Sequence, residues 1–417
     1  MEAKIIPWGQ IAPARPGAPL AGWCREEGST RRSPRTLALV LAGGKGSRLG
    51  ALTEKKVKPA LPVAGTYRLI DVALSNLVHS HLSDVWVVEQ FLPHSLNQHL
   101  ANGRPWDLDR THGGLQVLPP YQGTEGEGFA EGNADSLYRQ KDLIRDFAPD
   151  LVLVLSADHL YTLNFLDVID THLERGADLT VVTTLVDEDP SRYGVVQADD
   201  GGRVTGFDYK PDEPRGRLVA AEMFLYDAEK LLEALDLVHE QEGGLEDYGN
   251  DLVPWFVAHR TVVEHRLDGY WMDLGTLQSY WTAHMQMLDG DGVALDDPGW
   301  PILSAQPQRV PARIAGSAEL RGSMVAAGAM VRGAVEHSVL GPGVVVEEGA
   351  TVRGSVLLDG VRVGAGVTLD NVVADAGADI SGGSRRGSAK GVTLIDEDGE
   401  VRTTEEFDRR AVLPSGV

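Results

Sequence analysis

The last third of the chain places an apolar residue at nearly every sixth position, and this spacing restricts the folds available to it. The apolar positions are Leu340, Val346, Val352 and Leu358, and Val363 and Leu369 resume the step after a one-residue slip. The glycines that flank them are Gly341, Gly343, Gly349, Gly354, Gly360, Gly364 and Gly366. A six-residue period with small residues between is typical of a left-handed parallel β-helix with three short faces per coil. A Gly/Val-rich β-sandwich or a flexible linker is the alternative, but a linker would lack the regular valines.

The first two-thirds of the chain alternate apolar, β-rich runs with amphipathic helical patterns. The predicted strands are Leu37–Ala42, Val85–Glu89, Leu151–Ser156, Leu179–Val186, Gly194–Gln197 and Ala220–Tyr226. The predicted helices are Arg68–His79, Ala134–Arg145, Leu163–Glu174, Ala228–Leu237 and Leu277–Leu288. Alternating strands and helices predict an α/β, Rossmann-like domain with a mostly parallel sheet. In such sheets, ligands bind at the carboxyl ends of the strands.

These patterns divide the 417 residues into three parts. We expect a loosely ordered extension over residues 1–36, an α/β domain over 37–298, and a β-helix domain with a C-terminal tail over 299–417. The extension holds several prolines and the basic residues Arg31, Arg32 and Arg35, but it has no apolar core long enough for a signal peptide.

Charge and cysteine content exclude several classes of function. The formal net charge is −23, which argues against binding to nucleic acid or an anionic membrane surface. A small anion can still bind where a few cations gather locally. Cys24 is the only cysteine, so the chain can form neither an internal disulfide nor a cysteine metal cluster. No stretch approaches the length of a membrane span. We therefore expect a cytoplasmic protein.

A glycine-rich turn follows the first predicted strand and is the first indication of phosphate chemistry. Gly43, Gly44 and Gly46 allow a tight turn whose backbone N–H groups can approach an anion. Arg48 and Lys58 can neutralise phosphate charge. A Walker A loop and a dinucleotide fingerprint both fit the spacing less well. The alternative is a strand-to-helix turn with a surface arginine and lysine.

Two carboxylates are candidate metal ligands. Asp158 directly follows the buried strand Leu151–Ser156, where an isolated carboxylate would be costly without a compensating cation. Mg²⁺ prefers one or two carboxylates together with phosphate oxygens. Asp273 lies between aromatic residues and a glycine turn, and becomes a second candidate ligand when paired with Asp158. The alternative for Asp158 is a helix N-cap, and the alternative for Asp273 is an N-cap or a turn residue.

Two further segments suit substrate contacts. Gly132 and Asn133 open a predicted helix, where the glycine allows close approach and the amide can contact a base or sugar edge. A simple helix start is the alternative for this pair. Lys210 precedes a proline on an extended segment and could hold a second phosphate.

In combination and in this order, these segments resemble the sugar-1-phosphate nucleotidyltransferases, and most closely the bacterial ADP-glucose pyrophosphorylase group. The resemblance covers roughly residues 37–394. Its most specific motifs are Leu41–Leu49, Lys58–Ala60, Tyr67–Asn76, Ala157–Tyr161 and Tyr270–Thr276, with Gln90, His94–Leu96 and Trp300–Ile302 as further points. The C-terminal β-helix is also expected of that family.

The resemblance implies a mechanism and a set of site residues. A phosphate oxygen of a sugar 1-phosphate attacks the α-phosphorus of a nucleoside triphosphate and releases pyrophosphate, so catalysis consists of positioning and charge neutralisation. It implies that the glycine turn and Arg48 hold the triphosphate, that Lys58 lies near the transferred phosphate, and that Asp158 and Asp273 bind Mg²⁺. The implied substrate-binding residues are Gly43, Gly44, Gly46, Gln90, Gly132, Asn133, Lys210 and Glu222. A homo-oligomer, a dimer or tetramer, is also implied.

The sequence departs from the family pattern near the expected sugar and base. A usual Ser-Met-Gly is Ala220-Ala221-Glu222 here, which removes a hydroxyl and replaces a glycine with a carboxylate. Such a change in a polar pocket alters substrate discrimination. Synthesis of ADP-glucose from ATP and glucose 1-phosphate therefore stands beside ATP- or GTP-dependent activation of a cyclitol 1-phosphate such as valienol 1-phosphate. A non-catalytic regulatory subunit would be expected to lose Arg48, Lys58, Asp158 or Asp273, and all four are present.

Overall fold

The structure of the chain is a computed structural model. It describes residues 33–43, 46–90, 92–120, 132–242, 245, 247–306, 308–382, 385–408 and 410–414. The predicted extension lies almost entirely outside these residues. The fold described below belongs to one compact unit, Arg35–Val417.

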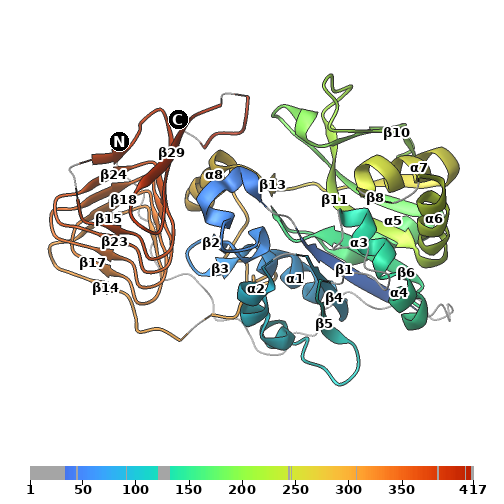
Figure 1. Ribbon diagram of the computed structural model, residues 1–417, viewed down its shortest axis with the longest axis horizontal. Coiled ribbons are helices and arrows are strands. Elements are labelled where there is room, and N and C mark those ends of the chain that lie inside the picture. The colour runs from blue at the N-terminus through green and yellow to red at the C-terminus, as the bar shows by residue number, and fades with distance from the viewer. Residues whose placement is uncertain are drawn as a thin grey trace. The chain divides into compact units, whose positions relative to one another are not determined.

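The α/β part is built on a nine-stranded sheet whose path runs β10-β9-β11-β6-β1-β4-β5, with β8 and β12 joined to it through β11 (Figure 1). Its strands are β1 (Thr36–Ala42), β4 (Asp84–Glu89), β5 (Gly114–Leu118), β6 (Leu151–Ser156), β8 (Leu179–Leu185), β9 (Gly194–Ala198), β10 (Val204–Tyr209), β11 (Leu218–Asp227) and β12 (Val262–Arg266). Strands β6, β1, β4 and β5 pair in parallel, whereas β11 runs antiparallel to β6 and β8. The predicted α/β class and all six predicted strands are confirmed.

Helices cover both faces of this sheet. They are α1 (Leu69–His79), α2 (Pro93–Leu100), α3 (Asn133–Arg139), α4 (Lys141–Phe147), α5 (Phe165–Arg175), α6 (Ala228–Glu242), α7 (Val253–His259) and α8 (Leu277–Asp289). Short helical turns are η1 (Ser47–Thr53), η2 (Lys58–Ala60), η3 (Ala101–Trp106), η4 (Pro190–Arg192) and η5 (Tyr248–Leu252). Two small two-stranded sheets pair β2 (Pro62–Val63) with β3 (Tyr67–Arg68) and β7 (His159–Tyr161) with β13 (Trp271–Asp273).

One predicted helix, Ala134–Arg145, is divided in the structure into α3 and α4. Gln140 lies between them with φ near −94° and ψ near 0°, at the margin of the right-handed helical region. Each of the two short helices makes its own contact with α6. Tyr138 stacks on His239 with ring centroids 3.8 Å apart, and Lys141 Nζ donates to Asp236 at 2.6 Å. Tertiary contacts thus override the helical pattern of the sequence.

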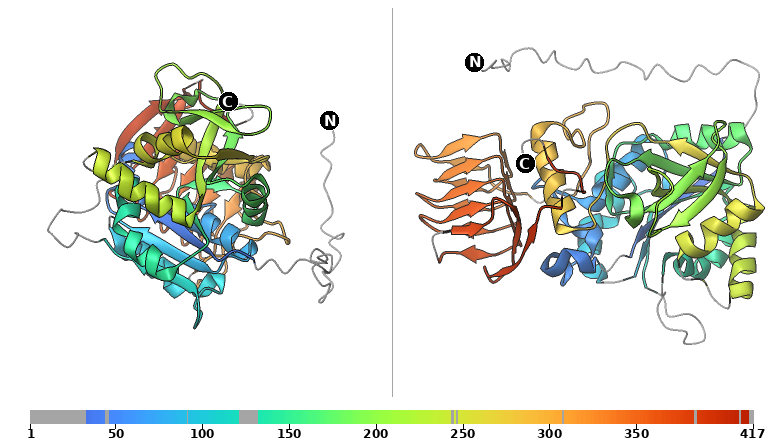
Figure 2. Two further views of the ribbon diagram at one scale, coloured as in Figure 1. Left: turned by 90° about the vertical axis from the view of Figure 1, so that its right-hand side faces the viewer. Right: turned by 90° about the horizontal axis from the view of Figure 1, so that it is seen from above.

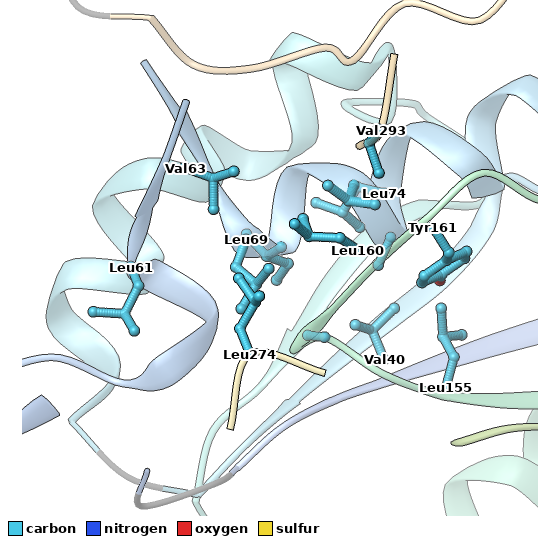
Figure 3. Close-up of a cluster of buried hydrophobic side chains, with 14 of the residues drawn as sticks. Val40, Leu61, Val63, Leu69, Leu74, Leu155, Leu160, Tyr161, Leu274 and Val293 are labelled. Carbon is cyan, nitrogen blue, oxygen red and sulfur yellow. The ribbon is translucent and has the colours of Figure 1, made fainter. Parts of the chain in front are cut away.

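The apolar core lies on both sides of the central strand. Successive side chains of β1 point to opposite faces, so Ala38 and Val40 join one buried cluster while Leu37 and Leu39 join the other. Figure 3 shows the first cluster, in which Val40 and Leu155 lie near Leu160 and Tyr161. A strand buried on both faces explains why β1 has a continuous apolar sequence.

The C-terminal part is a parallel β-helix whose stacked coils form three sheets, one on each face, with an antiparallel last strand on the third (Figure 2). The strands of the first sheet are β14 (Arg313–Ile314), β17 (Met330–Val331), β20 (Val345–Val346), β23 (Arg362–Val363) and β26 (Asp379–Ile380). The second holds β15 (Glu319–Arg321), β18 (Ala334–Glu336), β21 (Thr351–Arg353), β24 (Thr368–Asp370) and β27 (Arg385–Gly387). The third holds β16 (Met324–Val325), β19 (Val339–Leu340), β22 (Val356–Leu357), β25 (Val372–Ala374), β28 (Gly391–Ile395) and β29 (Val401–Glu406).

The register of the β-helix corrects one predicted position. Val346 pairs with Val363 and Val352 with Leu369, so these coils advance by 17 residues rather than 18. The shorter step falls on the third face, where Leu357 and not Leu358 points into the β-helix core. Leu358 instead joins the buried cluster that also contains Ala38 and Val40 of β1. The slip noticed in the sequence is therefore a regular five-residue face of each of these coils.

The β-helix packs directly against the α/β part. Val339, Val356 and Leu394 belong to the same buried cluster as the residues of β1 and α1. Trp281 of α8 is buried and donates its indole N–H to Gly354 O at 2.6 Å. Both parts thus share one continuous core. The domain boundary near residue 298 stays a prediction. Among the described residues, no helix is both long and apolar enough to cross a membrane.

We expect Leu369→Ala to destabilise the protein by about 2–5 kcal/mol, because it removes a fully buried side chain from the β-helix core and leaves a cavity. Leu320→Ala is the matched control, since Leu320 is 38% exposed at the first coil, and its effect should stay within about 0.5 kcal/mol. Urea unfolding followed by circular dichroism measures both. Equal losses in the two variants would contradict the predicted core.

Candidate functional site

A pocket of about 250 Å³ opens at the carboxyl ends of β1, β4 and β6. Parallel strands that end at one edge leave a crevice there, as expected for this class of sheet. The residues that line it are Leu41, Gly43, Lys58, Pro59, Val88, Gln90, Gly132, Asn133, Ser156, Asp158, Glu222, Asp247 and Tyr248. Seven of the predicted site residues, Gly43, Lys58, Gln90, Gly132, Asn133, Asp158 and Glu222, are thus brought together.

A three-membered ion cluster forms one side of this site. Lys58 Nζ donates to Asp158 Oδ2 at 2.6 Å and to Asp273 Oδ1 at 2.8 Å. The lysine is 5% exposed, so both interactions are shielded from water. Two carboxylates from different segments contact the same ammonium, so their negative charges favour a positive charge at that point.

The cluster shifts the proton affinities of all three groups. Burial disfavours the charged form of Lys58, but the two neighbouring carboxylates outweigh it and raise the pKa of the amine. Burial would raise the pKa of Asp158 and of Asp273, and the adjacent Lys58 ammonium lowers both instead. All three groups are therefore charged at neutral pH.

Strand pairing rather than helix capping positions the two carboxylates. Asp158 lies between β6 and β7, and β7 pairs antiparallel with β13, which places Asp273 opposite His159. The side chain that caps α8 belongs to Thr276, not to Asp273. The capping alternative is therefore wrong for both carboxylates.

The glycine turn is only partly described. Gly43 lies so close to the Gln90 amide that a Cβ at this position would be 2.2 Å from its oxygen. Gly46 has a φ of 60° and its carbonyl accepts from Thr53 Oγ1 at 2.8 Å. Gly44 lies outside the described residues. Arg48 is exposed on η1, and its guanidinium approaches the Gly275 turn that follows Asp273.

The opposite wall is formed by β4 and the start of α3. Gln90 Nε2 donates to Gly132 O at 3.1 Å and also to Ser136 Oγ. Asn133 Oδ1 accepts from Tyr248 N at 2.7 Å, which ties α3 to η5. The Asn133 side chain therefore has a structural partner as well as a place at the pocket.

Lys210 is exposed and stands outside the described lining of the pocket. Its Nζ donates to Tyr209 Oη at 2.7 Å, and Tyr209 Oη donates to Asp247 Oδ2 at 3.1 Å. Since Asp247 lines the pocket, Lys210 is linked to the site through Tyr209. Gly46, Arg48 and Asp273 also lie outside the lining residues.

A bulge in β11 turns Glu222 toward the pocket. Ala220 pairs with Thr183 and Phe224 with Val181, so three residues of β11 stand opposite one residue of β8. Glu222 has a φ of 55°, a left-handed conformation that favours glycine. Bulges beside functional sites commonly redirect a side chain in this way. The departure seen in the sequence thus changes the pocket wall itself.

Sequence reasoning missed four residues of the site. Asp247, Tyr248 and Ser156 line the pocket, and His159 Nε2 lies 3.4 Å from Asp158 Oδ1. Ser156 and His159 lie within two residues of Asp158, so their position in the sequence could have indicated that they belong to the site. Asp247 caps η5 and Tyr248 is its first residue, and no predicted site residue lies near them in the sequence. Only the packing of η5 against α3 brings them to the pocket.

Glu89 is a buried carboxylate at the end of β4, beside the glycine turn. It pairs in register with Ala42 of β1 and is 2% exposed. Asn97 donates to its Oε2 at 3.1 Å, whereas Oε1 has no hydrogen-bond partner within the described structure. Burial raises the pKa of Glu89 to about 7, and the Asn97 hydrogen bond only partly opposes this.

Comparison with known proteins identifies the class to which this fold and site belong. Residues 37–290 match the model of the family described as "Nucleotidyl transferase", and residues 310–392 match "GlmU-like, C-terminal hexapeptide". The first match covers more than half of the chain, so the chain belongs to the nucleotidyl transferase family. The second match agrees with the predicted left-handed hexapeptide β-helix.

Several relatives are similar over most of their length. A glucose-1-phosphate adenylyltransferase of Clostridium acetobutylicum is 38% identical over 74% of this chain and 82% of its own. The protein of the same name from Thermotoga neapolitana is 39% identical over 76% of each chain. A third, from Thermomicrobium roseum, is 40% identical over 70% of this chain and 69% of its own.

We expect Glu89→Gln to stabilise the protein at pH 8 but not at pH 4. The folded-state pKa of Glu89 is raised, so its ionisation destabilises the fold increasingly from about pH 4.5 to about pH 7. A shift of this size corresponds to at most about 3.4 kcal/mol above pH 7. Urea unfolding at the two pH values measures the difference. Glu229→Gln is the control, because the Glu229 side chain is 86% exposed. Its effect on the free energy of unfolding should be the same at both pH values. An equal gain at both pH values would contradict the assignment.

Proposed function

We propose that this chain transfers the adenylyl group of ATP to glucose 1-phosphate, forming ADP-glucose and pyrophosphate. The observation that carries the proposal is the convergence of Asp158 and Asp273 on Lys58 beside the strand-end pocket, which Lys58 and Asp158 line. The proposal is supported by relatives named glucose-1-phosphate adenylyltransferase at 36–40% identity over about three quarters of the chain.

The chemistry requires no nucleophile from the protein. The phosphate oxygen of glucose 1-phosphate attacks the α-phosphorus of ATP, the bond to the β-phosphate oxygen breaks, and pyrophosphate leaves. Lys58 is rigidly held at the pocket and can bind the transferred phosphate as its charge redistributes. The glycine turn and Arg48 are proposed to hold the triphosphate, and Gln90, Gly132 and Asn133 the base.

Asp158 and Asp273 are the residues proposed to hold Mg²⁺. Their fit to a cation is supported by the way both carboxylates reach the Lys58 ammonium within 2.8 Å. Oxygen ligands of this kind are what Mg²⁺ prefers. When bound, the ion supplies charge neutralisation at the phosphates.

A second acceptor deserves the same assay because Glu222 lies in the pocket wall. A carboxylate there, with Ala220 in place of a serine, changes the groups available to acceptor hydroxyls. A cyclitol 1-phosphate is therefore the alternative acceptor, with ATP or GTP as donor. We also propose a homo-oligomer, a dimer or tetramer that uses the β-helix, and a cytoplasmic location.

We expect pyrophosphate release to be fastest with ATP and glucose 1-phosphate in the presence of Mg²⁺. A matrix of ATP and GTP against glucose 1-phosphate and valienol 1-phosphate measures this. Faster release with the cyclitol would overturn glucose as the acceptor, and no release with any pair would overturn the enzyme assignment.

Asp158→Asn provides the negative control for that assay, since it keeps the shape but removes the charge that faces Lys58. We expect a loss of more than about 100-fold in kcat with an unchanged circular dichroism spectrum. Asp142→Asn, on the exposed face of α4, should keep full activity.

We expect Lys210→Ala to raise the KM for glucose 1-phosphate by about tenfold or more while changing the KM for ATP little. A charge-assisted hydrogen bond to phosphate is worth about 1.5–3 kcal/mol, which sets this magnitude. Steady-state kinetics with each substrate varied in turn measures the two constants. Lys390→Ala, at an exposed lysine of the β-helix, is the control. Equal increases in both constants would remove Lys210 from the acceptor site.

A further inference from the structure

A second set of potential metal ligands lies beside the Lys58 cluster. One ligand atom each from Asp158, His159 and Glu222 lies within 4.8 Å of the others. The three come from two segments, the end of β6 with the start of β7 and the bulge of β11. They join an imidazole to two carboxylates, so the set is more than a group of acidic side chains.

The two oxygens of Asp158 face different partners. Its Oδ2 accepts from Lys58, whereas its Oδ1 lies toward His159 Nε2 at 3.4 Å and accepts from Ser156 Oγ. Two ligands of one metal lie about 3.0–3.4 Å apart when their bonds of about 2.1 Å meet at octahedral to tetrahedral angles. The Oδ1 side of Asp158 and the imidazole of His159 therefore already have the spacing of neighbouring metal ligands.

Glu222 and Asp158 line the same pocket. The bulge of β11 and its left-handed backbone hold the Glu222 carboxylate within 4.8 Å of the ligand atoms of Asp158 and His159. A bound cation would compensate the two carboxylates gathered at this wall.

We propose that Asp158, His159 and Glu222 bind a divalent cation directly, without nucleotide, on the Oδ1 side of Asp158. His159 Nε2 also lies 3.7 Å from Asp273 Oδ1, so this position adjoins the Lys58 cluster. An imidazole with two carboxylates favours Mn²⁺, Co²⁺ or Zn²⁺ over Mg²⁺. The cation lies against the pocket wall formed by Glu222 and carries positive charge toward a bound phosphate. This last role rests on the proposed function, whereas the binding itself does not.

Titration of the nucleotide-free protein with Mn²⁺, followed by the electron paramagnetic resonance signal of the free ion, tests the proposal. We expect one Mn²⁺ per chain to bind before any substrate is added. Pulsed measurements on the bound ion should show coupling to a coordinating ¹⁴N nucleus, which His159 alone of the three residues can supply. Binding that requires ATP, or an ion without such coupling, would overturn the proposal.

Glu222→Gly separates loss of the ligand from loss of the fold. The position has a left-handed φ, so glycine relieves strain and the variant should fold at least as well as the parent. We expect its Mn²⁺ affinity to fall by about tenfold or more. Unchanged affinity in a folded variant would contradict the role of Glu222.

Asp247→Asn is the matched control for charge. Asp247 lines the same pocket and carries the same charge, but it lies outside the three-residue set. Its Mn²⁺ affinity should stay within about twofold of the parent, whereas an equal fall in both variants would reduce the effect to general electrostatic attraction. Binding is measured without substrates. A protein that binds Mn²⁺ but has no activity would therefore refute the proposed reaction and leave the metal site standing.

Discussion

The buried ammonium of Lys58 between Asp158 and Asp273 is the interaction on which the site depends. It joins η2, the link between β6 and β7, and the end of β13, which are far apart in the sequence. Burying one of these charges alone would cost several kcal/mol, whereas together they compensate one another. The three segments must therefore fold together, and the same charges that fix them are available to phosphates and cations.

This cluster also connects the pocket to the β-helix. Asp273 ends β13, Thr276 caps α8 three residues later, and Trp281 of α8 donates to Gly354 in the β-helix. The chain from carboxylate to β-helix is short and built from regular, buried elements. A shift in the position of α8 would move Asp273. Because α8 contacts the β-helix through Trp281, the β-helix helps to fix the position of Asp273.

Glu222 is the place where local preference and fold disagree most clearly. A left-handed backbone favours glycine, and a half-buried carboxylate beside Asp158 and His159 favours a cation. Such disagreements collect where function rather than stability selects the residue. In this chain the disagreement lies on the wall of the pocket, on the side where the sequence departs from its family pattern.

The sequence by itself determined the order of elements, the α/β class and the β-helix, because strand runs and the near-sixfold repeat are local periodic signals. It also indicated Lys58, Asp158 and Asp273, whose motifs are short and contiguous. It could not place Asp247 and Tyr248 or divide α3 from α4, since contacts between distant segments decide both. The second face of Asp158, with His159 and the bulged Glu222, was decided by tertiary structure alone. Side-chain direction there depends on strand register and a bulge, which no local pattern encodes.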